Sequence, residues 1–492
     1  MMFVTKDIRK YSIKKLFLYT ILGILISEGD SSVASENVRG ETPEKTKPNI
    51  VIFFTDDQGW ADTSVRMMKD RADSRSDFYR TPSLEKMATE GMVFSSAYAA
   101  APTCTPSRGG LQFGKTPCRL GQTVVHDRLA YDRGIDCKDQ LSIPQMIKSV
   151  DPDYVTAFFA KWGFHPRPPE HAEYDESDGN TNNGEGDYLL VKRRTPLPPD
   201  DPKRIFGISR RADEFMEKQV KAGRPFFMEL SHYAVHVDHA ALSESIEKYR
   251  KRRRPDDKRH RGENALIYAA MIENLDTALG QLLRKVEVLG INDNTYVIFT
   301  SDNGGGFKNN GPLKDGKGSD WEGGIRVPTV VSGPGVHKGS YCDVPIAAWD
   351  FFPTINALIG GKALPDDHDG GSLVDLFQKG NKGQVHRGTR ELVFHYPWYG
   401  NRPPMSVIRD GDYKLVMSLN NGEYRLYNLA DDIGEQNDLK GELPDRARKL
   451  HKTLLAYLQE VDAEDVEDMR MARMKEVESY RRRELQKEKP SE

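Results

Sequence analysis

The stretch that decides the fold is IVIFFTDD, at residues 50–57. Five apolar residues followed at once by Thr and two carboxylates are typical of a strand that is buried on both faces and ends at a polar edge. Three later segments repeat this pattern. They are residues 154–159 before Lys161, residues 226–230 before Ser231 and His232, and residues 296–299 before Asp302 and Asn303. The four runs predict a sheet whose strands stop at one chemically active edge.

Segments with apolar residues at helical spacing lie between these runs, at residues 205–219 and 265–288. Strands that alternate with helices predict an α/β fold. We expect a large mixed, mostly parallel sheet sandwiched by helices. In such sheets ligands bind beyond the carboxyl ends of the strands, where the polar side chains named above would meet.

The acidic side chains at this edge form a candidate metal site. Asp56 and Asp57 follow the first run, and Asp302 and Asn303 follow the last one. They offer only oxygen ligands, which suit calcium or magnesium rather than zinc. A pair of aspartates after a strand is also a common cap of a helix or turn, but the second pair favours the metal site.

The last part of the chain has a different pattern. Short strands are expected at residues 406–408, 413–416 and 425–427, and a helix with Leu450, Leu454, Leu455 and Leu458 on one side at residues 444–459. These elements predict a smaller C-terminal antiparallel sheet with a helix. The expected domains are a signal peptide at 1–34, a catalytic domain at 45–380, a C-terminal α+β domain at 385–465 and a charged tail at 466–492.

The N-terminus has the order of a secretory signal peptide. Lys14 and Lys15 precede an apolar run at residues 16–26, and small residues follow at 32–34. The run is too short to span a bilayer, so we expect a secreted or periplasmic protein without a stable membrane span. A retained N-terminal anchor is the less favoured alternative. A formal net charge of −3 argues against a nucleic-acid partner.

The stretch Cys104-Thr105-Pro106-Ser107-Arg108 holds the candidate nucleophile. Proline is favoured at the first turn, so Thr105 and Pro106 predict a helix start with Cys104 at the positive end of the helix dipole. Arg108, one turn later, can hold an anion beside Cys104. A buried thiol in a turn is the alternative. Among the other cysteines, Cys118 and Cys137 can form a disulfide outside the cytoplasm, although the sequence does not assign it.

Together these motifs resemble the sulfatase family. The matching stretches are residues 48–60, 104–108, 300–305, 316–318, 322–328 and 427–439. The resemblance implies an alkaline-phosphatase-like fold and an arylsulfatase-like sulfuric ester hydrolase. It also implies that a separate maturation enzyme oxidises Cys104 to formylglycine, whose hydrate is the nucleophile. Calcium would be bound by Asp56, Asp57, Asp302, Asn303 and the modified residue 104.

By the same resemblance, three cations would hold the sulfate group and stabilise charge on its oxygens: Arg108, Lys161 and Lys317. His236 would protonate the leaving alcohol, aided by Lys317, although the family's His-x-Pro is not kept after it. His232 is expected to be a packing histidine with its hydrogen bonds satisfied.

One departure from the family concerns the base that releases sulfate. Where the family commonly reads Lys-Trp-His-Leu-Gly, this chain has Gly163 in place of the histidine. His165 stands two residues later and is the candidate replacement.

The substrate class is left open by the sequence. A sulfated carbohydrate is favoured, and the strongly basic stretch at residues 248–261 could lie along a polyanionic glycan, although a solvated loop is the simpler interpretation. One alternative is a phosphonate or phosphate ester hydrolase on the same scaffold. Another is a catalytically silent protein that binds sulfated glycans.

Overall fold

The computed structural model describes residues 47–125, 139–163, 172–183, 198–253, 262–306, 310–399, 402–471, 474–475 and 478. The chain divides into residues 1–45 and residues 46–492, and all the elements below belong to the second part. The predicted signal peptide, His165, Cys137 and most of the charged tail lie outside the described residues. Within these ranges no helix is both long and apolar enough to cross a membrane.

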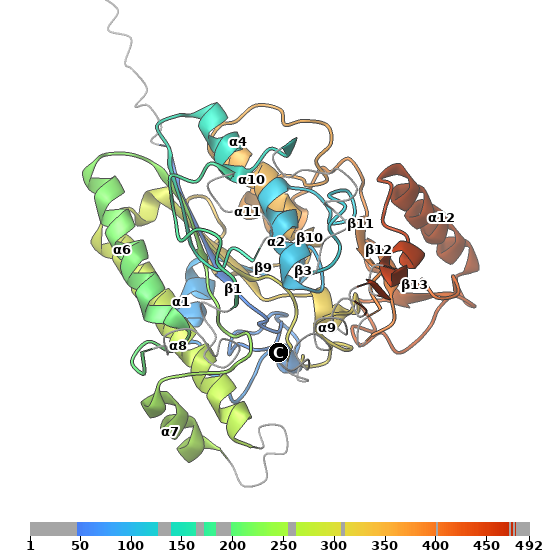
Figure 1. The fold of residues 1–492 in the computed structure, drawn as a ribbon, viewed down its shortest axis with the longest axis horizontal. Coiled ribbons are helices and arrows are strands. Elements are labelled where there is room, and N and C mark those ends of the chain that lie inside the picture. The colour runs from blue at the N-terminus through green and yellow to red at the C-terminus, as the bar shows by residue number, and fades with distance from the viewer. Residues whose placement is uncertain are drawn as a thin grey trace, which may run out of the picture. The chain divides into compact units, whose positions relative to one another are not determined.

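A sheet of eight strands runs through the centre of the described part (Figure 1). In order across the sheet, the strands are β5 (Glu176–Ser177), β4 (Val155–Ala160), β6 (Phe226–Ser231), β1 (Asn49–Thr55), β7 (Thr295–Ser301), β8 (Thr329–Ser332), β2 (Met92–Phe94) and β9 (Ser340–Cys342). Neighbours from β5 to β7 are parallel, whereas β8 is antiparallel to both its neighbours. The predicted mixed, mostly parallel sheet is therefore confirmed, with the four predicted strands side by side.

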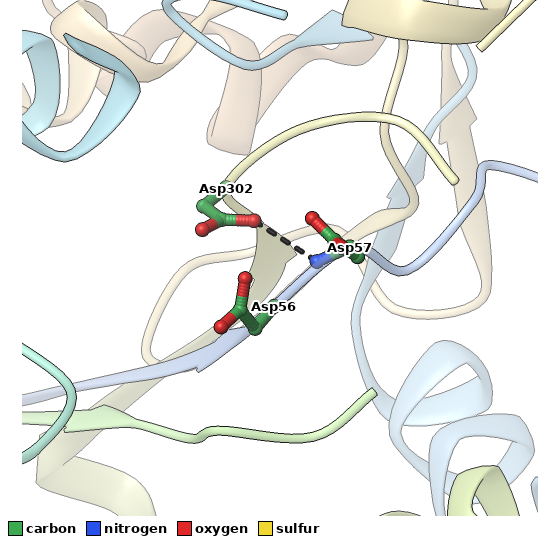
Figure 2. A group of neighbouring side chains, drawn as sticks. All are labelled: Asp56, Asp57 and Asp302. Carbon is green, nitrogen blue, oxygen red and sulfur yellow. Dashed lines mark hydrogen bonds between the residues drawn. The ribbon is translucent and has the colours of Figure 1, made fainter. Parts of the chain in front are cut away.

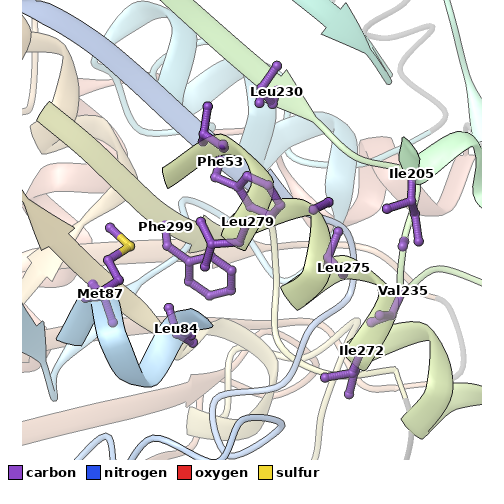
Figure 3. Packing of buried hydrophobic residues seen from close by; sticks show 14 of the residues in the cluster. Phe53, Leu84, Met87, Ile205, Leu230, Val235, Ile272, Leu275, Leu279 and Phe299 are labelled. Atoms are coloured by element: carbon purple, nitrogen blue, oxygen red, sulfur yellow. The ribbon is translucent and has the colours of Figure 1, made fainter. Parts of the chain in front are cut away.

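Helices cover both faces of this sheet. On β1, Ile52 and Phe54 belong to one hydrophobic core and Val51 and Phe53 to the other, which explains why the run is apolar throughout. The first core is closed by α2 (Cys104–Phe113), α4 (Ile143–Val150), α10 (Phe351–Leu358) and α11 (Val374–Lys379). The second is closed by α1 (Pro82–Glu90), α6 (Ile205–Lys221) and α8 (Glu263–Val288), as Figure 3 shows for part of it. A further helix, α7 (Ser243–Arg252), lies beside α8 (Figure 1).

The C-terminal sheet is antiparallel and has four strands: β11 (Leu392–Tyr396), β12 (Met405–Asp410), β13 (Tyr413–Ser418) and β14 (Tyr424–Asn428). It packs against α12 (Pro444–Glu460) through a core that includes Leu450 and Leu454. The predicted sheet and helix are confirmed, but β11 was missed. The prediction for Leu455 was wrong, because its position is rotated by about 100° from Leu454 and it is 46% exposed.

A buried group of charges joins this sheet to α9 (Glu322–Ile325), and we call it the C-terminal charge network. Its members are Tyr98, Glu322, Arg326, Arg409, Lys414 and Glu435. Glu322 accepts from Lys414 at 2.9 Å on one oxygen, and from Arg326 at 3.0 Å and the Tyr98 hydroxyl at 2.7 Å on the other. Lys414 also lies 2.7 Å from Glu435. The network fixes the C-terminal sheet to α9, which follows the loop that carries Lys317.

Candidate active site

The predicted meeting of acidic side chains at one edge of the sheet is seen in the structure. β1 and β7 are parallel with Thr55 opposite Ser301, so the residues that follow them emerge side by side. Asp56, Asp57 and Asp302 each offer a carboxylate oxygen within 4.8 Å of the other two (Figure 2). The backbone N–H of Asp57, which has a positive φ of 63°, donates to Asp302 Oδ1 at 3.0 Å.

Two oxygens in this cluster have no hydrogen-bond partner among the described residues, Asp56 Oδ1 and Asn303 Oδ1. Both residues are fully buried, where an acceptor without a donor is costly. Asn303 uses its amide N–H to donate to Asp57 Oδ1 at 2.8 Å, so its oxygen is left free. A hard cation would satisfy these oxygens, and the four residues fit one because they offer oxygen ligands alone.

Each carboxylate of the cluster also faces a protein cation. The pairs are Lys161 with Asp56 at 2.6 Å, Lys317 with Asp57 at 2.6 Å and Arg108 with Asp302 at 2.7 Å. We call these residues and Asn303 the active-site cluster. All three predicted cations are thus brought to the predicted acids.

The charges in the cluster shift one another's protonation. Burial alone would raise the pKa of Asp56, but Lys161 and further cations hold it well below its usual value. Burial, joined by the charge of Asp56, raises the pKa of Asp302 to about 6 despite Arg108. The crowding of carboxylates therefore costs free energy that a bound cation would recover.

Cys104 lies at the start of α2, one residue earlier than the predicted helix start, and is 5% exposed. A negative charge at position 104 would act on two of the cations. Burial opposes the charge on Lys317, but Asp57 and Cys104 together hold the pKa of Lys317 above its usual range. Burial likewise opposes the charge on Arg108, whose pKa is raised by Asp302, Asp56 and Cys104. The predicted placement of Arg108 beside Cys104 is consistent with this.

Arg108 is held on several sides. Its guanidinium donates to the Lys161 carbonyl at 2.8 Å and to the Ser231 hydroxyl, and it lies 5.2 Å above the Phe54 ring. Ser231 itself donates to the Lys161 carbonyl at 2.7 Å. Ser231 was predicted at the end of a strand without a role of its own; its place at the same edge as the other site residues was the available signal.

His236 is nearly buried beside the cluster. Its Nε2 lies 3.9 Å from Asp57 Oδ2 and 3.3 Å from the Asn183 side-chain nitrogen. If Nδ1 carries the proton and donates to the Val237 carbonyl, Nε2 accepts from Asn183. Sequence reasoning missed Asn183, for which the polar stretch around it gives no signal.

Gly163, where the family commonly has histidine, leaves space that a side chain would fill beside two of the cations. Its φ is +66°, and a side chain there would bring Cβ to 3.1 Å from Arg108 Cδ and 3.3 Å from Lys161 Cε. His165, the predicted replacement base, lies outside the described residues.

His232 is confirmed as a packing residue, with its ring 4.4 Å from that of Phe53. The expectation that its hydrogen bonds are satisfied was wrong. Neither ring nitrogen has a partner in the described ranges, because the strand end places the ring among apolar side chains. Burial lowers the pKa of His232 to about 3, so the ring is neutral.

The loop that carries Lys317 is held by the C-terminal part of the chain. Arg402 donates through Nε to the Lys317 carbonyl at 3.2 Å and pairs with Asp315 at 2.5 Å. Lys314 donates to the Glu435 carbonyl at 3.1 Å and lies 3.4 Å above the Trp321 ring. No sequence motif pointed to Arg402, because its role depends on how the C-terminal sheet docks.

Comparison with known proteins gives one family. The sulfatase family model matches residues 48–361. A protein named sulfatase from Formosa agariphila is 27% identical, over 92% of this chain and 95% of its own. The N-acetylgalactosamine-6-sulfatase of Mus musculus is 31% identical, over 75% of this chain and 71% of its own. The crystal structure of Ps i-CgsB, also solved in complex with k-i-k-neocarrahexaose, has a TM-score of 0.69 at 25% identity and covers 84% of this chain and 92% of that one.

The fold and the acidic cluster at the edge of the sheet define a hydrolase of the alkaline-phosphatase-like class. More narrowly, the chain belongs to the sulfatase family and is an arylsulfatase-like enzyme that hydrolyses sulfate esters.

Proposed function

We propose that this sulfatase removes sulfate groups from a sulfated carbohydrate, outside the cytoplasm, using formylglycine at position 104 and a calcium ion. The observation that carries the proposal is the meeting of three carboxylates within 4.8 Å of one another, beside a helix that starts at Cys104. A carbohydrate substrate is supported by the relatives, since one is named for N-acetylgalactosamine 6-sulfate and another was crystallised with k-i-k-neocarrahexaose.

Four residues would hold the calcium ion: Asp56, Asp57, Asp302 and Asn303. Bound there, calcium would supply Lewis-acid stabilisation of negative charge on oxygen. Formylglycine at position 104 would supply an oxygen nucleophile in place of the thiol.

The chain's own cations would bind and orient the sulfate group. Arg108 stands one turn from position 104 and is fixed by Asp302, so it can stabilise negative charge there without reorganising. Lys161 and Lys317 approach from the neighbouring strand end and loop, where their ammonium groups can take the sulfuryl oxygens. His236, with both ring nitrogens protonated, would donate a proton through Nε2 to the leaving alcohol and return to the neutral form described above.

Mass spectrometry of the peptide that contains residue 104 tests the nucleophile. We expect an aldehyde in protein produced with a formylglycine-generating enzyme and a thiol without it, with activity following the aldehyde. Full activity of the thiol form would contradict the proposal. Paired aryl sulfate and aryl phosphonate substrates test the reaction, and we expect sulfate turnover to be at least about 10³-fold faster.

The leaving-group acid is tested by substrates that differ only in their alcohol. For His236→Ala we expect little loss with a nitrophenyl sulfate and a loss of about 10²-fold with a sugar sulfate, because only the poor leaving group needs a proton. Equal losses with both would assign His236 to another role.

His165 remains our proposed base for sulfate release. In His165→Ala, rapid mixing with an aryl sulfate should give a burst of alcohol near one per active site, followed by slow turnover. Unchanged steady-state rates would place the base elsewhere.

A further inference from the structure

A basic groove lies outside the active-site cluster, between α7, α8 and the segment that precedes α1. Its volume is about 900 Å³, which is within the usual range for ligand sites. Five cationic side chains line it, together with two acids. The cations are Arg80, Lys248, Lys251, Arg252 and Arg284, and the acids are Glu273 and Asp276.

Both acids are already engaged by the protein. Glu273 pairs with Lys248 across the two helices. Asp276 accepts from the backbone N–H groups of Ser83 and Leu84, at 2.9 Å each, and so caps the start of α1. The backbone N–H groups carry no net charge, so Asp276 still counts against the cations, and the lining has five cationic and two acidic side chains.

Four cations of the groove therefore remain unpaired with acids. Within the described part of the chain, no ion pair is formed by Arg80, Lys251, Arg252 or Arg284; Arg252 donates only to the Asp77 carbonyl, at 2.9 Å. All four are exposed. Arg80 precedes α1, Lys251 and Arg252 lie on α7, and Arg284 lies on α8. The fold, and not one basic stretch of sequence, therefore brings these charges together.

The groove is also connected to the site along the chain. α7 begins seven residues after His236, and the backbone N–H of Leu242 donates to Asn274 on α8 at 2.9 Å. His239 lies between His236 and Leu242 in the sequence, and its ring is 5.2 Å from that of Tyr268 on α8. The segment that leaves the active site is thus packed against α8 before it enters the groove.

We propose that this groove binds sulfate groups of a polysaccharide chain at a distance from the ester that is cleaved. The inference rests on the proposed action on sulfated carbohydrates, and it adds a second contact that anchors a long substrate. Guanidinium and ammonium groups bind sulfate through charge-assisted hydrogen bonds, and several together recognise a polyanion. A monosulfated aryl ester has no second sulfate group to place in the groove.

The test compares Arg80→Gln/Lys251→Gln/Arg284→Gln with a control that removes the same charge elsewhere, Lys362→Gln/Lys449→Gln/Lys452→Gln. Binding of dextran sulfate is measured by titration over a range of salt concentrations. We expect affinity to fall at least tenfold in the groove variant and less than twofold in the control. The dependence on salt should also weaken, because fewer counterions are released from the polyanion on binding.

Turnover separates this inference from the proposed function. Both triple variants should hydrolyse an aryl sulfate at the wild-type rate, whereas the groove variant should show a raised KM on a sulfated polysaccharide. Equal loss of dextran sulfate binding in both variants would overturn the groove site. So would equally tight, groove-dependent binding of single-stranded DNA, which would mark a general polyanion surface. Absence of polysaccharide turnover by the wild type would contradict the proposed function. The comparison of dextran sulfate binding between the two variants would still decide whether the groove is a binding site.

Discussion

The active-site cluster and the C-terminal charge network are both buried and both consist of acidic and cationic side chains. They differ in whether the carboxylate oxygens find hydrogen-bond donors within the protein. In the network, both oxygens of Glu322 accept bonds from protein groups. In the active-site cluster, one oxygen of Asp56 is bonded to Lys161; the other lies 3.8 Å from Arg108 and has no hydrogen-bond partner in the described ranges. Glu322 is satisfied by protein side chains alone, whereas Asp56 keeps one oxygen available to a ligand. Buried carboxylates whose oxygens are all bonded help to stabilise the fold. A buried oxygen without a donor lowers the stability of the unliganded protein but is available to bind a cation.

The largest expected effect comes from the active-site cluster. Asp302→Ala should remove the cation and lower kcat/KM at least about 10⁴-fold, because the variant loses a metal ligand and the partner of Arg108. The fold should persist, as judged by circular dichroism and the urea midpoint. Cys104→Ala is the matched control that keeps every cation and acid. It should lose turnover but keep binding of the sulfate ester, and wild-type turnover in it would remove position 104 from the mechanism.

A substitution in the C-terminal charge network should lower stability more than activity. Lys414→Met leaves Glu322 and Glu435 buried without their ammonium partner and should lower the free energy of unfolding by about 3–5 kcal/mol. Urea denaturation measures this. Below the unfolding temperature the kcat on an aryl sulfate should fall less than in Asp302→Ala. If kcat falls as far as in Asp302→Ala while the free energy of unfolding hardly changes, the network acts mainly by positioning Lys317.

Another buried acid, Glu229 on β6, differs from those of both regions because it forms no ion pair in the described ranges. Its Oε2 accepts from Gln112 at 2.7 Å, and burial raises its pKa to about 8 from an ordinary value of 4.5. Between these values the unfolded chain has lost the proton and the folded one keeps it, so stability falls as pH rises. Relative to Glu229→Gln, the wild type should lose roughly 3 kcal/mol of stability between pH 5 and pH 8. Parallel pH profiles of the two urea midpoints would show that Glu229 titrates normally.

The smallest effect is expected from the cation itself. Calcium at about 100 times its Kd should raise the free energy of unfolding by about 2.7 kcal/mol. Thermal melts with calcium and with a chelator measure it. Asp302→Asn should lose this gain and Lys414→Met should keep it. If both variants respond alike, calcium binds outside the active-site cluster.

Much of this arrangement was predictable from sequence, because strand ends carry their polar residues with them. The apolar run before Asp56 and the run before Asp302 each predicted a buried strand, and parallel pairing then required the acids to meet. The same reasoning placed Lys161. β11 was missed even though turn-forming residues, Gly388 and Pro397, stand on either side of its five residues, Leu392–Tyr396.

The contacts that position the site were not predictable. Arg402 reaches the Lys317 loop only through the docking of a separate sheet, and Asn183 reaches His236 through an irregular segment. Neither position follows from a local pattern, since both depend on where distant elements come to rest. Ser231 was the exception, because it stands at the same edge as the predicted site residues.

The order of the strands also determines at what stage of folding the residues of the active-site cluster come together. β1 is flanked by β6 and β7, and the bond from Asp57 to Asp302 joins residues 245 positions apart. Such distant pairing closes a long loop and is slow relative to local folding. During synthesis, Asp56 and Cys104 emerge long before the strand that completes their surroundings. The proposed conversion of Cys104 by a modifying enzyme would therefore be easier before the sheet is complete, because the folded residue is only 5% exposed.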